Sequence, residues 1–120
     1  MKNMKYPFEF TTIKIDEAHE VLTIHLPQEL SMVSEFLLCD VQSDTHGRYY
    51  LEIIGNVLCG KESTQRIEGN VYELSIKGDI TVLTNALLKN EPPNYCKIET
   101  IELKELILLW LNEKKRRHFS

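Results

Sequence analysis

The sequence lacks the features that mark secreted, membrane-spanning and disulfide-stapled proteins. Its three cysteines, Cys39, Cys59 and Cys96, are widely spaced and form no C-x-x-C pair, whereas a secreted disulfide framework has an even number. No apolar run approaches the roughly 18 residues of a membrane helix. The opening MKNMKYPFEF places Pro7 and Glu9 where a signal peptide needs an apolar segment. We therefore predict a cytoplasmic protein with reduced thiols that does not bind a membrane.

The signatures of common catalytic and cofactor sites are also missing. The five glycines form neither G-x-G-x-x-G nor a phosphate loop, and no serine stands in a G-x-S-x-G elbow. His19, His25 and His118 show neither H-x-x-x-H nor H-E-x-x-H spacing. A zinc site built from the three thiolates would have no local ligand spacing to support it. These absences favour a protein that is not an enzyme and that holds no cofactor or metal.

Charge is distributed unevenly along the chain. The net charge is −4, but the segment KKRR at 114–117 supplies four of the fourteen basic residues. Residues 1–113 therefore carry ten basic against eighteen acidic side chains. A body this acidic is repelled by nucleic-acid phosphate and by anionic membranes, and is attracted to a basic partner. We expect a basic protein partner, and the charge disfavours nucleic acid.

Apolar alternation and β-branched or aromatic residues predict a largely antiparallel sheet. The predicted strands cover residues 8–15, 20–26, 33–42, 48–58, 66–77 and 95–101. The side chains expected to face the core are Leu22, Ile24 and Leu26 in the second strand and Tyr72, Leu74 and Ile76 in the fifth. In the fourth strand Tyr49 and Tyr50 should point to opposite faces, so that one of them is exposed. That strand would place Tyr49, Leu51, Ile53 and Val57 on one face, with a bulge at Gly55.

Two segments show helical periodicity. Asp79 can cap a helix over residues 80–89, which EPPN at 91–94 would end. Residues 103–117 form the strongest predicted helix, with an apolar stripe wide enough to leave a homodimer possible: Leu103, Leu106, Ile107, Trp110 and Leu111. Together the elements predict an α+β fold in a single domain over residues 1–120. We expect a curved, mainly antiparallel sheet of five to six strands, with the short helix and the long C-terminal helix packed on it.

The densest group of reactive side chains lies in CDVQSDTHGRYY, residues 39–50. In an enzyme, Asp44 and His46 would act as an acid–base pair or bind a metal, with Arg48 stabilising an anion and Cys39 as the nucleophile. However, SDTHG at 43–47 is rich in turn formers and ends on glycine. We interpret the segment as a solvated hairpin loop between the strands over 33–42 and 48–58.

The basic run KKRRH at 114–118 has two interpretations. It could contact nucleic acid or an acidic partner, with Tyr49 and Tyr50 stacking on bases. Alternatively, cations at the end of a helix complement the helix dipole and keep the chain end soluble. The acidity of the remaining chain favours the second interpretation.

The chain resembles the immunity proteins of bacterial contact-dependent inhibition and related polymorphic toxin systems. The resemblance rests on length, acidity and a strand-rich body containing YLEIIGNV and GNVYELSIKGD, followed by the helix LKELILLWLNEKKRR. It implies a small, cytosolic, non-enzymatic protein that binds and neutralises a nuclease-type or other basic toxin. We expect six residues to contact the toxin: Asp40, Asp44, His46, Tyr50, Glu52 and Glu73. Strand alternation is expected to place the acidic side chains among them on the outside.

Two other functions are compatible with the sequence. The first is a small metal-dependent hydrolase that uses Asp44, His46 and Asp40. The second is a nucleic-acid adaptor that binds through its basic C-terminal tail.

Overall fold

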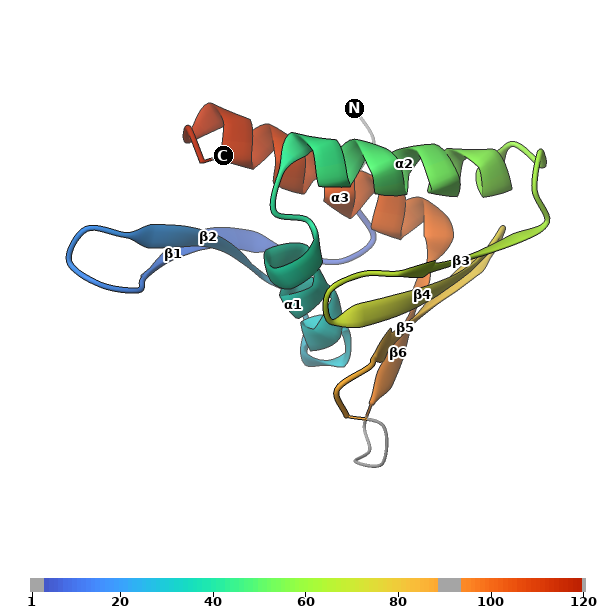
Figure 1. The fold of residues 1–120 in the computed structure, drawn as a ribbon, viewed down its shortest axis with the longest axis horizontal. Helices are drawn as coiled ribbons and strands as arrows, with labels where there is room; N and C mark the ends of the chain where they lie inside the picture. Colours follow the sequence, from blue (N-terminus) through green and yellow to red (C-terminus); the bar gives the residue numbers. More distant parts are fainter. Residues whose placement is uncertain (1–3, 89–93, 120) are drawn as a thin grey trace.

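The chain forms a layer of helices over one face of a four-stranded sheet, with a separate two-stranded hairpin (Figure 1). The computed structural model describes residues 4–88 and 94–119. In chain order its elements are β1 (Glu9–Lys14), β2 (Glu20–His25), a 3-10 helix (Gln28–Leu30), α1 (Ser31–Asp40), α2 (Asp44–Leu58), β3 (Thr64–Glu68), β4 (Tyr72–Lys77), β5 (Ile80–Asn85), β6 (Tyr95–Glu99) and α3 (Thr100–Arg116). The α+β fold class expected from the sequence is thus confirmed.

The larger sheet is an antiparallel meander in the order β3-β4-β5-β6. Its register aligns side chains from the four strands in rows across the sheet, and the central row of the inner face is Ile67, Leu74, Leu83 and Cys96. Along β4, the alternate residues Tyr72, Leu74 and Ile76 are buried, as the sequence predicted, whereas Ser75 and Lys77 are exposed. One face of this sheet is therefore core and the other faces solvent.

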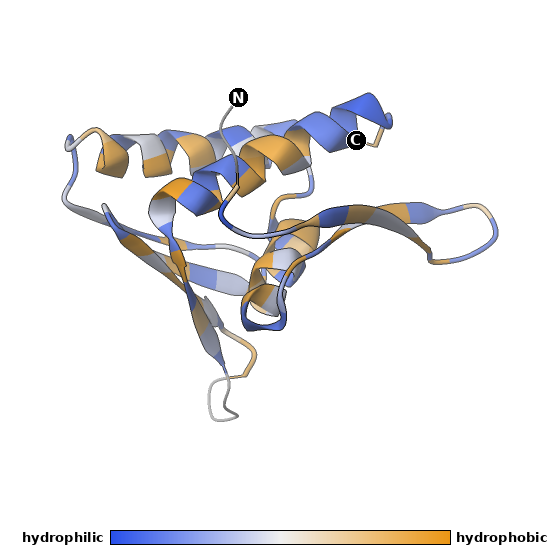
Figure 2. Ribbon diagram, turned by 180° about the vertical axis from the view of Figure 1, so that it is seen from behind, coloured by the Kyte–Doolittle hydropathy of each residue, from blue (hydrophilic) through white to orange (hydrophobic). Residues whose placement is uncertain are grey.

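Helices α1, α2 and α3 all pack against the inner face of the meander, and each contributes buried apolar residues to one core cluster with the sheet. Figure 2 colours these residues along the ribbon by hydropathy. The buried stripe of α3 contains most of the predicted residues, namely Leu103, Leu106, Ile107 and Trp110. Inside this core the Trp110 indole Nε1 donates a hydrogen bond of 2.8 Å to the carbonyl oxygen of Val41. The longest helix is thereby fixed to the short connection between α1 and α2.

Two of the predicted strands are helices. Residues 33–42 lie mostly in α1, and residues 48–58 lie in α2, so the six strands of the described residues are divided between two sheets and do not form one. The buried residues of α2 are Gly47, Tyr50, Ile54 and Val57, a spacing of three to four that belongs to a helix. The expected shared strand face of Tyr49, Leu51, Ile53 and Val57 is therefore wrong, and Gly55 is a helical residue and not a bulge.

Gly47, which was expected to end a hairpin loop, is a helical residue at the contact between α2 and α3. It is buried in the first turns of α2, where an added Cβ would overlap the side chain of Leu111 on α3. The glycine therefore lets two helices approach closely, and it does not end a hairpin loop. At the neighbouring position Tyr49 is 55% exposed while Tyr50 is buried, so one tyrosine is exposed as predicted.

The segment predicted as a helix over 80–89 begins instead with strand β5. Thr81, Leu83 and Asn85 are buried in alternation, and β5 pairs with both β4 and β6. Asp79 does cap a backbone amide, that of Ile80, but the chain continues as a strand. Residues 91–93, expected to end the helix, lie outside the described residues.

The predicted strand over 66–77 is two strands separated by a tight turn. β3 and β4 are joined at Gly69 and Asn70, where the Gly69 amide donates to the carbonyl oxygen of Tyr72 at 2.8 Å. The N-terminal pair of strands is confirmed as β1 and β2, with Leu22 and Ile24 buried. This hairpin extends away from the rest of the fold (Figure 1).

The Trp110–Val41 hydrogen bond predicts a large effect of substitution in α3. Trp110→Phe removes the donor, leaves the buried Val41 carbonyl unsatisfied and opens a small cavity, so the free energy of unfolding should fall by about 2 to 4 kcal/mol. Urea denaturation followed by circular dichroism measures this change. Leu108→Ala on the same helix is the control, because Leu108 is 41% exposed. Equal losses in the two variants would contradict a specific role for the indole donor.

Candidate functional site

The segment CDVQSDTHGRYY runs from the end of α1 into the first turns of α2. Ser43 is the N-cap of α2, and its hydroxyl accepts a hydrogen bond of 3.2 Å from the backbone amide of His46. Asp44 in the first turn binds Arg48 one turn later, with 2.6 Å between Arg48 Nε and the carboxylate, and this pair is exposed. The polar residues that suggested a hairpin loop thus start a helix, since serine and aspartate are favoured at this end.

Asp44 and His46 contribute to different surface hollows. Asp44 lines a hollow beside α3, together with Leu111 and Lys115, whereas His46 lines a hollow on the side of the β3–β4 turn. Within residues 4–88 and 94–119, no group of three or more histidine, cysteine or carboxylate side chains is arranged to hold a metal ion. The structure therefore does not bring together the acid–base pair that the enzyme alternative needs.

The hollow beside the β3–β4 turn collects three of the expected contact residues. It has a volume of about 150 Å³ and lies where the end of α1, the start of α2 and the turn meet. We call it the α2 hollow, and it is lined by Asp40, His46, Tyr49, Tyr50, Glu68, Gly69 and Asn70. Two carboxylates, two tyrosines and no lysine or arginine appear in this lining.

Asp40 forms the floor of the α2 hollow and is not an outward-facing residue. It is only 3% exposed, and its two carboxylate oxygens accept hydrogen bonds from the backbone amides of Val71, at 3.0 Å, and Tyr72, at 2.8 Å. The expectation that strand alternation places Asp40 outward is corrected, because Asp40 ends a helix whose last turn faces β4. Its charge nonetheless lies directly beneath the hollow.

Tyr50 is buried between α1 and the β3–β4 turn. Its ring packs edge-on against Phe36, with 5.1 Å between the ring centroids. Burial, followed by the negative charge of Asp40, raises the pKa of the Tyr50 hydroxyl to about 12. The hydroxyl is therefore a neutral hydrogen-bond donor at physiological pH and is not a general base.

Tyr49 provides the exposed aromatic surface of the α2 hollow. Its ring meets Tyr50 edge-on, with the centroids 5.9 Å apart, while more than half of the residue remains open to solvent. Exposed tyrosines backed by a rigid buried neighbour are favoured contact residues in protein interfaces. Tyr49, Glu68 and Asn70 were absent from the predicted contact set, although the pair Gly69-Asn70 is a recognisable turn signal.

The remaining predicted contact residues lie outside the α2 hollow. Glu52 is exposed further along α2. Glu73 lies on the outer face of the sheet, where it forms an ion pair with Arg66. Asp44, Glu52 and Glu73 are therefore not among the lining residues of the α2 hollow, although Glu73 lies directly opposite Glu68 in the β3–β4 register.

The basic C-terminal run is largely engaged by its own helix. Arg116 and Arg117 both donate to the carboxylate of Glu113, which lowers the pKa of Glu113 to about 2, with the Arg116 hydrogen bond as the largest cause. The ammonium group of Lys114 lies 5.4 Å from the centroid of the Trp110 ring, and burial lowers its pKa. These contacts agree with the helix-end interpretation of the basic run.

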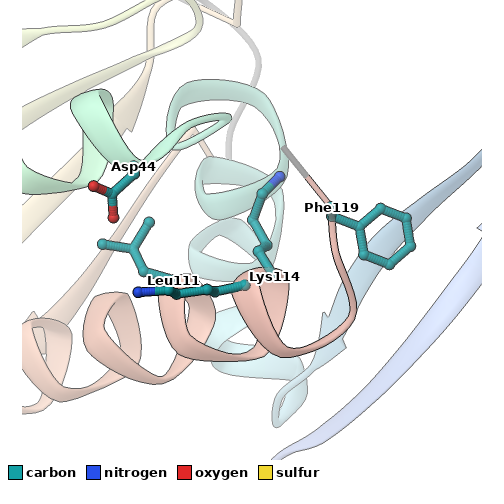
Figure 3. A pocket seen from close by; sticks show the side chains of 5 residues that line it. Asp44, Leu111, Lys114 and Phe119 are labelled. Carbon is teal, nitrogen blue, oxygen red and sulfur yellow. The ribbon is translucent and has the colours of Figure 1, made fainter.

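A second, larger hollow lies between the first turn of α2 and the end of α3 (Figure 3). Its volume is about 310 Å³, and it is lined by Asp44, Leu111, Lys114, Lys115 and Phe119. We call it the α3 hollow. Its cationic rim and apolar floor contrast with the acidic lining of the α2 hollow.

None of the helices in the described residues is long and apolar enough to cross a membrane. Among known proteins, the chain is 36% identical over 112 residues to a protein of Bacillus cereus named immunity protein. The alignment covers 93% of this chain and 91% of that relative. No family model matches the chain, and no solved structure matches it.

The close contact at Gly69 predicts that adding one methyl group there, in Gly69→Ala, destabilises the fold. A Cβ at Gly69 would lie 2.5 Å from the Tyr50 hydroxyl and 2.6 Å from a carboxylate oxygen of Asp40. Because both groups are held by the core, Gly69→Ala should lower the free energy of unfolding by about 1 to 3 kcal/mol. Gly55→Ala is the control: nothing lies within 4 Å of its added Cβ, and alanine in a helix interior is favoured by about 0.5 to 1 kcal/mol. Thermal or urea unfolding should give opposite signs for the two variants, and a stabilised Gly69→Ala would contradict the geometry.

Proposed function

The chain belongs to the family of the Bacillus cereus immunity protein, and from this premise we propose that it neutralises a cognate toxin by direct binding, without catalysis. The toxin in this proposal is a basic, nuclease-type domain, and the complex forms in the cytoplasm. The acidic surface around the α2 hollow is the contact region. Asp44 and Glu52 on α2 and Glu73, which lies opposite Glu68 in the β3–β4 register, add negative charge outside the hollow. We assign them a steering role and not a place in the central contact.

The observation that carries the proposal is the chemistry of the α2 hollow. A cationic side chain of the toxin would meet the carboxylate of Glu68 at the rim, the charge of Asp40 beneath it and the exposed ring of Tyr49. Carboxylates bind guanidinium and ammonium groups through charge-assisted hydrogen bonds, and a tyrosine ring adds a cation–π contact.

A nuclease-type toxin fits this chemistry because its own substrate is anionic. A domain that binds nucleic-acid phosphate carries lysine and arginine along its binding surface. A protein with an acid-lined hollow in a body of excess negative charge is attracted to that surface, which speeds association and can cover the phosphate-binding groups. Neutralisation by steric cover needs no reactive group on the immunity protein.

The toxin is identified first, and its contact is tested next. The tagged chain is isolated from its native cells at low salt, and a stoichiometric partner is identified by mass spectrometry. Support for the proposal requires that this partner is toxic when expressed alone and harmless when the chain is expressed with it. A partner whose toxicity persists in the presence of the chain would contradict the proposal.

Glu68→Lys should then weaken binding of the purified toxin by about 100-fold, since it replaces an attraction at the hollow with a repulsion. Tyr49→Ala should weaken binding about tenfold through the loss of an exposed aromatic contact. Isothermal titration calorimetry at two salt concentrations measures both effects.

The matched control is Glu62→Lys, which makes the same change in net charge at an exposed residue in the loop after α2. It should alter the dissociation constant by less than about threefold, as is usual for a charge outside the contact. Equal effects of Glu68→Lys and Glu62→Lys would place the contact elsewhere. Loss of a catalytic activity in Asp44→Asn and His46→Ala, with toxin binding intact, would support the hydrolase alternative instead.

A further inference from the structure

The β1–β2 hairpin and the C-terminal end of α3 project from the same end of the molecule (Figures 1 and 2). β1 and β2 pair with each other in a two-stranded sheet that is separate from the four-stranded meander. A two-stranded ribbon is marginally stable in water without further cover. The base of the hairpin is covered, since Leu22 and Ile24 are buried, but the tip extends beyond the body.

The tip of the hairpin exposes apolar side chains. Ile13 is 53% exposed and Ile15 is 65% exposed, and Ile13 is paired in register with Val21 on the opposite strand. The amide of Ile15 donates to the carbonyl oxygen of His19 at 2.9 Å, so the backbone here is ordered and the isoleucines stand on a defined surface. An exposed, β-branched strand of this kind is a surface suited to pairing with another chain.

The hairpin tip is also acidic. Asp16, Glu17 and Glu20 are exposed in or beside the turn, against the single cation Lys14. The Asp16 carboxylate is engaged within the turn, where it accepts from the Ala18 amide at 2.8 Å. Glu17 remains the outward charge of the tip, because Glu20 lies opposite Lys14 in the register and lines a hollow with Lys114 and Phe119 of its own chain.

The α3 hollow has the complementary character. Leu111 and Phe119 supply its apolar surface, and Phe119 lies on the side of the hollow nearest the hairpin (Figure 3). Its charged residues are Lys114, Lys115 and Asp44, and the Asp44 carboxylate is already paired with Arg48. Whereas Arg116 and Arg117 are bound to Glu113, Lys115 is exposed at the rim. An acidic ribbon with exposed isoleucines matches this surface in both charge and polarity.

We propose that a second copy of this chain covers these surfaces, with the hairpin tip of each protomer on the α3 hollow of the other. In a dimer with a two-fold axis, the contact between hairpin and α3 hollow occurs twice, once in each direction. Both contacts can form together because the two surfaces lie at the same end of the molecule. Ile13 and Ile15 then lie on the apolar floor, and Glu17 of the turn lies beside Lys115. No residue of the α2 hollow takes part, so the dimer does not depend on the proposed toxin contact.

The test is the oligomeric state of the full chain without any toxin. Sedimentation equilibrium is measured at protein concentrations from about 5 to about 500 µM, because small interfaces associate on roughly the micromolar scale. It should show a monomer–dimer equilibrium in which dimerisation weakens as the salt concentration rises. Ile15→Ser should weaken dimerisation about tenfold, since it removes an apolar contact from the interface. Ile15 is 65% exposed in the monomer, so circular dichroism should show an unchanged fold.

A charge exchange distinguishes this contact from any other dimer interface. Glu17→Lys and Lys115→Glu should each weaken dimerisation about tenfold, and the double variant should return to within about threefold of the unmodified chain. Glu62→Lys is the control and should leave the dimer unchanged.

Three outcomes would overturn the proposal. The first is a monomer at every concentration, and the second is a dimer unaffected by Ile15→Ser and Lys115→Glu. The third is a monomer whose Ile15→Ser variant loses affinity for the identified toxin, which would assign the hairpin to the toxin and not to a second copy. Since Tyr49 and Glu68 report toxin binding separately, failure of the dimer leaves the test of the proposed function intact.

Discussion

The junction of Asp40 and Val41 is the constraint on which the arrangement of the layers depends. The Asp40 carboxylate accepts from two consecutive amides at the start of β4, and the next residue's carbonyl accepts from the Trp110 indole of α3. One dipeptide thus ties the first helix to both the sheet and the last helix. A buried carboxylate is costly unless its oxygens are satisfied. The β3–β4 turn must therefore close in one position, and Gly69 is required there because the carboxylate and the Tyr50 hydroxyl occupy the space of a Cβ.

The same junction determines the character of the surface above it. Within residues 4–88 and 94–119, the Asp40 carboxylate accepts from two backbone amides and forms no ion pair with a lysine or arginine, and its negative charge lines the α2 hollow. Tyr50, held against Phe36, in turn supports the exposed ring of Tyr49. A structural carboxylate and a core tyrosine thereby place charge and aromatic surface at one point. In the proposed complex, this surface would meet a cation without the reorganisation that a flexible acidic loop would need.

The sequence identified those elements in which local pattern and tertiary environment agree. The alternation in β2 and β4 and the stripe of α3 were predicted correctly, because each buries one regular face. Helices α1 and α2 were predicted as strands since β-branched and aromatic residues outweighed the spacing of Gly47, Tyr50, Ile54 and Val57. Asp40 and Tyr50 were expected among the contact residues because they lay on predicted strands, and those segments are the helices α1 and α2. The partners of Asp40 lie 31 and 32 residues away, and no local pattern reveals a contact of that separation.

The excess acidity of residues 1–113 is not spread evenly over the fold. Glu68 and Asp40 line the α2 hollow, whereas Lys114 and Lys115 line the α3 hollow. The carboxylates of the hairpin tip lie in or beside the β1–β2 turn, and Glu20 shares a hollow with Lys114. The fields of neighbouring opposite charges largely cancel for a partner that is more than about 10 Å away in physiological salt. The hairpin's field is therefore partly offset by α3, whereas the α2 hollow has no cation in its lining. In the proposed complex, a basic partner would therefore meet no lysine or arginine among the described residues that line the α2 hollow. This difference is the physical reason to separate a toxin contact at α2 from a self-complementary contact at the hairpin.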